Sequence, residues 1–363
     1  MKRKLKNVLV TGGAGFIGSN FIHYIYKEAS FTGKIINVDK LTYVGNLENL
    51  EEIENKYDRD RYFFEKVDIC DYKQMKKVFE NYDIDTIVNF AAESHVDRSI
   101  YGPKSFVQTN IMGTFNLLEV ARECWKMKCS EEILFHHIST DEVYGSIEKG
   151  DYFYECTAYK PNSPYSASKA SSDHLVRAYY KTYGLPVTIS NCSNNYGPYQ
   201  FPEKLIPLIV LNIMEEKDLP IYGDGKNVRD WLHVDDHCGA IWEILNKGVV
   251  GETYNIGGEN EWENIRLVNI LCEKMAKIKG KEKDYYKKLI VFVKDRPGHD
   301  RRYSINCDKI KNELNWKRSY DFEKGLDVTI EWYMNHQSWL ERVRSGAYKK
   351  WLKRNYTSRQ SFR

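Results

Sequence analysis

The stretch Asn7 to Gly18, NVLVTGGAGFIG, joins a short β-branched run to a cluster of glycines and then to an apolar helical pattern. Residues 7–10 predict a buried strand, and residues 17–27 predict a helix. Glycines at such a junction let the backbone turn tightly and approach a pyrophosphate, while the helix N-terminus supplies free N–H donors. The order of strand, glycine turn and helix is therefore typical of a dinucleotide-binding unit. The alternative is a glycine turn that binds nothing.

An acid ends the next predicted strand. Residues 35–38 are apolar or β-branched apart from one asparagine, and Asp39 follows them, about 20 residues after the glycines. A carboxylate there accepts hydrogen bonds from ribose hydroxyls and repels a 2′-phosphate, which favours NAD over NADP. The neighbouring Lys40 keeps NADP as an alternative.

The same alternation continues through the first half of the chain. Strand-like runs at residues 62–64, 86–90, 133–135 and 187–189 are separated by helical patterns such as 72–81 and 110–125. This order predicts an α/β fold, a Rossmann-type doubly wound parallel sheet. After about residue 195 prolines and turn signals cluster, and residues 253–256 look like a strand returning to the main sheet. We therefore expect a Rossmann domain of residues 1–195 with a returning segment near 231–260, a smaller interleaved C-terminal substrate-binding lobe of residues 196–230 and 261–340, and a basic tail of residues 341–363.

Composition excludes several classes of protein. Lys and Arg number 54 against 51 Asp and Glu, so the chain lacks the basic field of a nucleic-acid-binding protein. We expect no membrane association, because no apolar run reaches membrane-spanning length. The eight cysteines are scattered without a C-x-x-C pair, which predicts neither a metal site nor a disulfide framework and favours a reduced, cytoplasmic setting. The basic residues at the two ends are interpreted as solvated termini.

Tyr165 and Lys169 form a candidate reacting pair. Ser163 and Pro164 are suited to cap and begin a helix, and a spacing of four places the two side chains on one face of it. A lysine ammonium and an oxidised nicotinamide both favour the phenolate of a nearby tyrosine. Such a phenolate can take a proton from a substrate hydroxyl while the carbon beneath it loses hydride. Outside a dinucleotide-binding fold, the Y-x-x-x-K pattern on a helix is more often without function.

Two adjacent acids, Asp141 and Glu142, follow the predicted strand that leads into HISTDEVYG. Ligands of open α/β sheets bind at the carboxyl ends of the strands, so acids at this point are candidate catalytic or binding residues. Consecutive carboxylates can serve as acid and base if their surroundings push their pKa values apart. The alternative is a helix N-terminal acid pair that complements the helix dipole.

These motifs carry a resemblance to a known family. The glycine motif, the YxxxK pair and AAESHVDRS (91–99) resemble the extended short-chain dehydrogenase/reductases that act on nucleotide sugars. Within that superfamily, HHISTDEVYG, SPYSASKASSDHLVRAYYKTYGLP, NCSNNYGPYQFPEKLIPL and DRPGHDRRY resemble the dTDP-glucose 4,6-dehydratases, from about residue 7 to about residue 355.

The resemblance implies a reaction and roles for the motif residues. It implies oxidation of carbon 4 of dTDP-glucose, elimination of water from carbons 5 and 6, and return of the hydride to carbon 6, so that NAD is not consumed. Asp141 would be the acid, Glu142 the base, and Thr140 would lie near Tyr165 at the carbon-4 hydroxyl. The product, a 4-keto-6-deoxy sugar nucleotide, begins deoxysugar synthesis in the family, for example toward rhamnose.

The resemblance also implies two sets of binding residues. Cofactor contacts fall at Gly12, Gly15, Phe16, Ile17, Gly18, Asp39, Lys40, Thr42, Asp68, Ile69, Ala92, Ser94, Thr109, Tyr165, Lys169 and Asn195. Substrate contacts fall at Ser94, Thr140, Asn194, Lys204, Leu205, Pro220, Tyr222, Arg229, Asn264, Asp295, Arg296 and His299. A homodimer is implied as well, in which the Tyr165 helix and the helix of residues 110–125 of each subunit form a four-helix interface.

Three alternatives stay open at this point. A nucleotide-sugar 4-epimerase of the same fold uses the same tyrosine and lysine but needs no acid–base pair for elimination. A 4,6-dehydratase could instead take a UDP-, GDP- or CDP-hexose. A non-catalytic NAD-sensing protein could keep the fold, although such proteins usually lose the tyrosine or the lysine.

Overall fold

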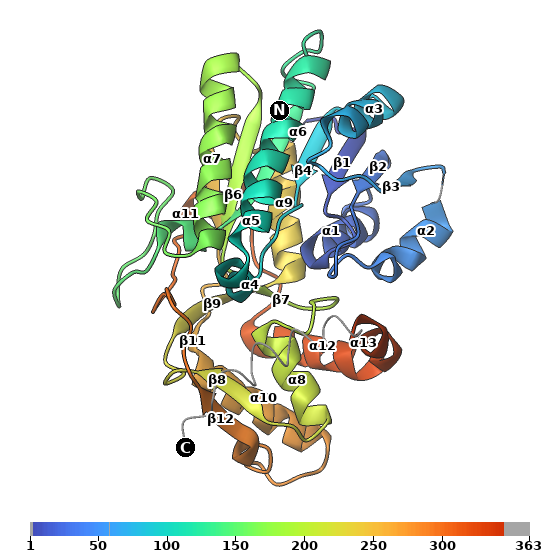
Figure 1. Cartoon of the computed structure of the whole chain (residues 1–363). Coiled ribbons are helices and arrows are strands. Elements are labelled where there is room, and N and C mark those ends of the chain that lie inside the picture. Colours follow the sequence, from blue (N-terminus) through green and yellow to red (C-terminus); the bar gives the residue numbers. More distant parts are fainter. Residues whose placement is uncertain (1–2, 58, 345–363) are drawn as a thin grey trace.

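The computed structural model describes residues 3–57 and 59–344, and its centre is a parallel sheet (Figure 1). The sheet has seven strands in the order β10-β6-β5-β4-β1-β2-β3. This confirms the Rossmann-type doubly wound sheet, and the segment 253–256 pairs in parallel with β6 at its edge. The strands are β1 (Asn7–Thr11), β2 (Lys34–Val38), β3 (Tyr62–Glu65), β4 (Thr86–Asn89), β5 (Leu134–Thr140), β6 (Val187–Cys192) and β10 (Thr253–Ile256).

Helices cover both faces of the sheet, as successive β1 residues illustrate. Val8 and Val10 pack with apolar residues of α1 (Phe16–Lys27) and α9 (Val234–Lys247). Leu9 points to the opposite face and packs with α3 (Tyr72–Tyr82), α6 (Thr114–Cys124) and α7 (Pro164–Tyr183). Because side chains alternate across a strand, a strand covered on both faces is apolar at every position, which explains the continuous Val-Leu-Val run.

The order of the strands places a ligand site. β2 and β4 lie on either side of β1, and the chain continues from them in opposite directions. At this switch point the carboxyl ends of β1 and β4 leave a crevice that the connecting loops do not cross. The glycine turn after β1 opens into this crevice.

One predicted helix differs from the structure. The pattern of residues 110–125 predicts a single helix, but α6 begins at Thr114 and a π-helical segment, η2 (Val107–Gly113), precedes it. A Cβ atom on Gly113 would lie 2.5 Å from the Ile69 side chain, so the chain passes close to the cofactor side of the sheet. Short π-helical turns occur often at functional sites. Here the wide turn carries Thr109 to the crevice.

The remaining short elements of the first half connect the strands. They are η1 (Leu47–Leu50), α2 (Glu51–Tyr57), α4 (Val96–Tyr101), α5 (Pro103–Phe106) and η3 (Asp141–Tyr144).

A second lobe lies below the sheet in Figure 1, with its own apolar core. It contains a three-stranded sheet in the order β11-β9-β7 and a two-stranded sheet of β12 and β8. Its elements are β7 (Asn194–Tyr196), α8 (Leu205–Met214), β8 (Leu219–Tyr222), β9 (Val228–His233), β11 (Glu261–Glu263), α10 (Asn264–Ile278), η4 (Lys287–Leu289), β12 (Ile290–Val293), α12 (Phe322–Asn335) and α13 (Gln337–Val343), while α11 (Asp308–Leu314) packs near β10.

The basic N-terminal end is held against α9. Arg3 was expected in a solvated terminus, but its guanidinium donates hydrogen bonds to the backbone oxygens of Leu245 and Gly248. It thereby satisfies free carbonyl groups at the C-terminal end of α9. Most of the predicted basic tail, residues 345–363, lies outside the described residues. Among residues 3–57 and 59–344, no helix has both the length and the apolar character needed to span a bilayer.

Candidate active site

The crevice at the switch point is a cavity that continues toward the second lobe. Its walls come from the ends of β1, β2, β4, β5 and β6 and from the start of α8. All sixteen residues predicted to contact the cofactor line it, namely Gly12, Gly15, Phe16, Ile17, Gly18, Asp39, Lys40, Thr42, Asp68, Ile69, Ala92, Ser94, Thr109, Tyr165, Lys169 and Asn195.

The glycine turn packs too tightly for side chains. Gly12 has a φ of +70°, and a Cβ atom there would lie 2.8 Å from the backbone of Ala91. A Cβ atom on Gly18 would lie 2.4 Å from the carbonyl oxygen of Gly12. The first turn of α1 therefore sits directly on the loop, and its free N–H groups face the cavity where a pyrophosphate would bind.

Asp39 is held by the same loop. It accepts hydrogen bonds from the backbone N–H groups of Ala14, at 3.1 Å, and Leu41, at 2.8 Å. Burial raises the pKa of Asp39, and these two bonds oppose the rise. The Lys40 amine is turned toward Asp68, at 3.5 Å, and donates to the Thr109 hydroxyl. A carboxylate in the cavity wall, with the nearby lysine paired to another acid, fits an adenosine ribose without a 2′-phosphate.

The two adjacent acids occupy different surroundings at the end of β5. Glu142 lines the cavity, whereas Asp141 lies behind it with 2% of its surface exposed. One Asp141 oxygen, Oδ1, accepts from the Thr140 hydroxyl at 3.3 Å, and the other has no hydrogen-bond partner. Burial raises the pKa of Asp141 well above its usual value, and the charges of Glu142 and Asp230 raise it further. Asp141 is therefore the acid that keeps its proton.

Three cations act on Glu142. Burial raises the pKa of Glu142, but Arg296, Arg229 and Lys204 each lower it. The pKa of Glu142 remains above its usual value, with Asp300 adding to the rise, while the pKa of Asp141 lies well above its usual value and is opposed by one cation, Arg229, and by the Thr140 hydrogen bond. The surroundings thus separate the two pKa values, and Asp141 holds its proton more firmly than Glu142.

Tyr165 and Lys169 reach the cavity from α7. The predicted cap is confirmed, because Ser163 and Ser166 form a capping box and Pro164 begins the helix. Burial raises the pKa of Tyr165 well above its usual value, and a hydrogen bond with Thr140 opposes the rise. The Lys169 amine donates to the backbone oxygen of Ile138, at 2.7 Å, rather than pointing at the phenol. Burial lowers the pKa of Lys169 to about 8, and Asp173 acts in the opposite direction.

The predicted substrate residues fall into two groups. Ser94, Thr140, Asn194 and Lys204 line the cavity, and Leu205 begins α8 directly after it. The others lie in the second lobe outside this cavity wall, at Pro220, Tyr222, Arg229, Asn264, Asp295, Arg296 and His299.

Hydrogen bonds fix several residues of this outer group. The Tyr222 hydroxyl donates to Asp97 of α4 at 2.8 Å, and Arg296 lies 3.6 Å from the other oxygen of the same carboxylate. The Arg229 guanidinium donates to the backbone oxygen of Asp300 at 2.9 Å and stacks 4.2 Å from the Tyr303 ring centre. His299 Nδ1 lies 2.6 Å from Asp295 Oδ1. Arg229 and Arg296 of this outer group also lower the pKa of Glu142, although both lie outside the cavity wall.

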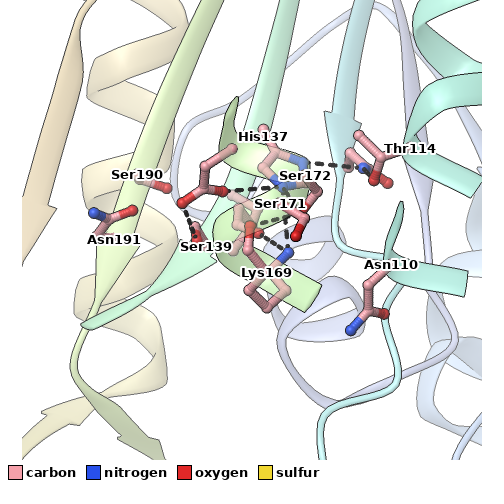
Figure 2. Close-up of polar contacts among 12 residues, drawn as sticks. Asn110, Thr114, His137, Ser139, Lys169, Ser171, Ser172, Ser190 and Asn191 are labelled. Atoms are coloured by element: carbon pink, nitrogen blue, oxygen red, sulfur yellow. Dashed lines mark hydrogen bonds and ion pairs between the residues drawn. The ribbon is translucent and has the colours of Figure 1, made fainter. Parts of the chain in front are cut away.

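Sequence reasoning missed several polar residues near the site. His137 and Asp173 form a buried cluster with Lys169, shown in Figure 2 for His137 and Lys169. Glu93 and Glu203 line the cavity. The sequence could have indicated Asp173, because it follows Lys169 by four residues, as Lys169 follows Tyr165. It could not have indicated His137, because His137 lies on a strand that packs against this helix.

The fold and this cavity define a member of the extended short-chain dehydrogenase/reductases. A family model described as GDP-mannose 4,6-dehydratase matches residues 9–329. A dTDP-glucose 4,6-dehydratase of Shigella flexneri is 53% identical over 97% of this chain and 99% of its own length. The solved dTDP-glucose 4,6-dehydratase of Bacillus anthracis, in complex with NAD, is 49% identical and covers 93% of this chain and 99% of its own, with a TM-score of 0.82.

The next comparisons separate the dehydratases from their sister enzymes. A dTDP-glucose 4,6-dehydratase structure from Streptomyces venezuelae, with NAD bound, is 44% identical with a TM-score of 0.85, covering 93% of this chain and 99% of its own. A UDP-glucose 4-epimerase from Thermotoga maritima shares the fold at 28% identity and a TM-score of 0.79, over 91% and 99%. The chain belongs to the dTDP-glucose 4,6-dehydratase family.

Proposed function

We propose that this chain converts dTDP-glucose to dTDP-4-keto-6-deoxyglucose with bound NAD, as a hydro-lyase. The observation that carries the proposal is that the buried Asp141 holds its proton more firmly than the cavity-lining Glu142, whose carboxylate three cations favour, beside Tyr165. The names of the relatives agree with it. A 4-epimerase needs no acid–base pair for elimination, so this pair favours the dehydratase.

The proposed reaction requires a base or an acid at each of three positions of the sugar. Neither the carbon-5 proton nor the carbon-6 hydroxyl of glucose is activated, but a ketone at carbon 4 makes the neighbouring carbon-5 proton acidic. Bound NAD supplies a hydride acceptor at the start of the turnover and a hydride donor at its end. The protein must therefore supply a base for the carbon-4 hydroxyl, a base for carbon 5 and an acid for the departing hydroxyl.

Tyr165 is the proposed base at the carbon-4 hydroxyl. The phenol holds its proton in the free protein because it is buried near Glu142. Thr140 hydrogen-bonds it, and the Lys169 ammonium one helical turn away favours the phenolate. Loss of the substrate proton to Tyr165 leaves the carbon-4 oxygen ready to become a carbonyl.

Glu142 is the proposed base at carbon 5 and Asp141 the proposed acid at the carbon-6 hydroxyl. Glu142 lines the cavity and three cations favour its carboxylate form, which can accept the carbon-5 proton. Asp141, the preceding residue of the same 3₁₀ turn, holds its proton more firmly and is proposed to give it to the leaving hydroxyl, which departs as water. Each such proton transfer typically accelerates a reaction by ~10²–10⁴.

The binding roles follow the placement of the residues. The glycine turn and the start of α1 would hold the pyrophosphate of NAD, and Asp39 the adenosine ribose. The remaining cavity-lining cofactor residues named above complete that site. Lys204, Arg229 and Arg296 are the proposed ligands of the substrate diphosphate, because guanidinium and ammonium groups bind phosphate oxygens. Asn194, Pro220, Tyr222, Asn264, Asp295 and His299 are the proposed surround of the sugar and base.

The test is incubation of the purified protein with dTDP-glucose and NAD, followed by the absorbance of the keto product in alkali. The proposal predicts product formation with dTDP-glucose. A galactose-type product, or no product from dTDP-, UDP-, GDP- and CDP-hexoses, would overturn it. Product from another hexose nucleotide alone would keep the elimination chemistry and correct the substrate.

A homodimer belongs to this proposal. The segment η2 packs against α7 and leaves Val107 and Met112 with 49% and 42% of their surfaces exposed. Met112 lies in the segment 110–125 named for the four-helix interface and Val107 lies just before it, so these exposed apolar side chains support a second copy as their partner. The wild type is expected to sediment as a dimer and Val107→Glu as a monomer. A wild type that sediments as a monomer would contradict the dimer. The expected cytoplasmic location stays a prediction.

A further inference from the structure

We propose that Asp173 and His137 are positioning residues that keep Lys169 protonated and directed at the cavity, a role beyond the YxxxK pair itself. The inference rests on the proposed function of Lys169 as an ammonium beside Tyr165. It starts from three residues at equal spacing on α7, namely Tyr165, Lys169 and Asp173. A spacing of four places them on one face of the helix, with the acid deepest in the molecule.

The acid is fully enclosed. Asp173 has 0% of its surface exposed, and Lys169 and His137 have 4% and 1%. Asp173 Oδ2 accepts from the Ser139 hydroxyl at 2.7 Å, and Oδ1 lies 3.4 Å from His137 Nε2. An ionised carboxylate removed from water is costly unless other groups compensate its charge. Ser139 is a neutral hydrogen-bond partner of Oδ2, and Oδ1 is a buried oxygen without a hydrogen-bond partner, so the charge itself is left to be balanced.

His137 stands between the acid and the lysine. Its Nε2 atom lies 3.3 Å from Lys169 Nζ, 3.2 Å from Ser172 Oγ and 3.4 Å from Asp173 Oδ1. Figure 2 shows Lys169 and Ser172 from α7 meeting His137 of β5 in this way. Its Nδ1 atom lies 3.1 Å from the amide nitrogen of Asn89 on β4. The Asn89 amide nitrogen can only donate, so Nδ1 accepts from it and the proton of the neutral ring lies on Nε2. This N–H group can donate to Ser172 or Asp173, and the Lys169 amine lies beside it without accepting from it.

His137 cannot supply the compensating charge. Burial lowers the pKa of His137 to about 4, so the imidazole is neutral at physiological pH. Burial alone would raise the pKa of Asp173, but His137, Lys169 and Ser139 together hold it below its usual value. Asp173 is therefore ionised, and Lys169 is the cation that acts on it. The neutral ring fills the space between them, with Nε2 3.4 Å from the carboxylate and 3.3 Å from the amine.

The surroundings of Lys169 contain few other charges. Asp173 of α7 and Cys192 of β6 act on its pKa, and His137 of β5 lies beside its amine. Tyr165 and Glu142 line the same cavity. Burial raises the pKa of Cys192 to about 12, so that thiol is neutral at pH 7. Among these groups, Asp173 is the permanent anion that the mechanism does not consume, since Glu142 gains a proton during the proposed reaction.

The direct test measures the protonation of Lys169 without turnover. Holoenzyme labelled with ¹³C at the lysine ε-carbon is titrated by NMR, and the Lys169 signal is assigned by its loss in Lys169→Met. Wild-type Lys169 is expected to titrate near pH 8, and in Asp173→Asn the midpoint is expected to fall by about one pH unit or more. A midpoint that stays within about 0.3 pH unit of the wild type overturns the proposal.

The pH dependence of kcat provides the second readout. Loss of Asp173 makes the ammonium easier to deprotonate, so the alkaline limb of kcat should move to lower pH by a similar amount while KM changes little. Asp173→Glu restores the charge and should return the limb toward its wild-type position. Ser171→Ala, on the same helix but partly exposed, is the matched control and should leave the profile unchanged.

His137→Leu covers the case in which Asp173→Asn does not fold. It removes the bridging ring and keeps the acid, and the proposal predicts the same direction of shift for the lysine midpoint. An unchanged midpoint in a folded His137→Leu protein, with Asp173→Asn unfolded, overturns the bridging role. If the wild type forms no product from any hexose nucleotide, the proposed function is wrong. The NMR titration of Lys169 still tests the role of Asp173 and His137 in that case. If the wild type is active and the midpoint does not move, the inference alone fails.

Discussion

Asp141 and Glu142 are consecutive residues, yet Glu142 forms part of the cavity wall and Asp141 lies behind it with one carboxylate oxygen unpartnered. The 3₁₀ turn that begins at Asp141 produces this division, because successive side chains of such a turn point in different directions. The Thr140 side chain caps the turn by accepting from the backbone N–H of Glu142 at 3.3 Å. A base and an acid thus come from one short segment.

Replacing Glu142 with glutamine should remove the base and leave the shape of the cavity. We expect exchange of the substrate carbon-5 proton with solvent deuterium, followed by NMR, to slow by ~10²–10⁴. Glu148→Gln, an exposed acid six residues later, is the matched control. Exchange at the wild-type rate in Glu142→Gln would show that another group takes the proton.

Asp141→Asn should change stability with pH as well as activity. The folded-state pKa of Asp141 is raised, so its contribution to stability is fully present below the unfolded pKa and is lost as pH rises through the folded pKa. Asparagine cannot ionise and escapes this loss. In urea unfolding of NAD-saturated protein, the stability of the variant relative to the wild type should therefore increase as the pH rises from the usual aspartate pKa toward neutrality. A difference that does not vary with pH would contradict the buried-acid assignment.

Tyr165→Phe keeps the ring and removes the hydroxyl. Because the phenol is proposed to take the carbon-4 hydroxyl proton, kcat should fall by ~10²–10⁴ with KM changed only a few-fold. Tyr154→Phe, at a tyrosine with 47% of its surface exposed, serves as the control. The measurement is the steady-state rate of keto-product formation. A Tyr165→Phe enzyme as fast as the control would show that the Tyr165 hydroxyl does not take part in the reaction.

Asp39→Asn should weaken NAD binding. The wild-type carboxylate accepts from the N–H groups of both Ala14 and Leu41. The NH2 group of asparagine would face one of these two N–H groups, so that hydrogen bond would be lost. We expect NAD to bind about ten-fold more weakly by calorimetry, and the preference over NADP to narrow. The exposed Asp60→Asn is the comparison. Unchanged affinity for both cofactors would place the ribose elsewhere.

Local patterns predicted the parts of the site that one segment supplies. The glycine turn, the capped helix of Tyr165 and Lys169, and the acids after β5 each lie within a few residues, so spacing alone indicated their arrangement. The order of strands and helices likewise predicted the sheet.

Parts of the site assembled from distant segments were not predictable in the same way. The influence of Arg229 and Arg296 on Glu142 requires the second lobe to fold back against η3, and their positions came only from the resemblance. His137 meets Asp173 because β5 packs under α7, which no local pattern encodes. The start of α6 was placed four residues early, since the helical periodicity does not distinguish a π-helical turn from an α-helical one.

The most direct measurement of the central claim is NMR of the product formed by the purified protein from dTDP-glucose deuterated at carbon 4, in ordinary water. The account predicts a 4-keto-6-deoxy product with the deuterium at carbon 6 and a solvent proton at carbon 5. A product that keeps its carbon-6 hydroxyl and has deuterium at carbon 4 with inverted configuration would show epimerisation, and it would contradict the elimination assigned to Asp141 and Glu142.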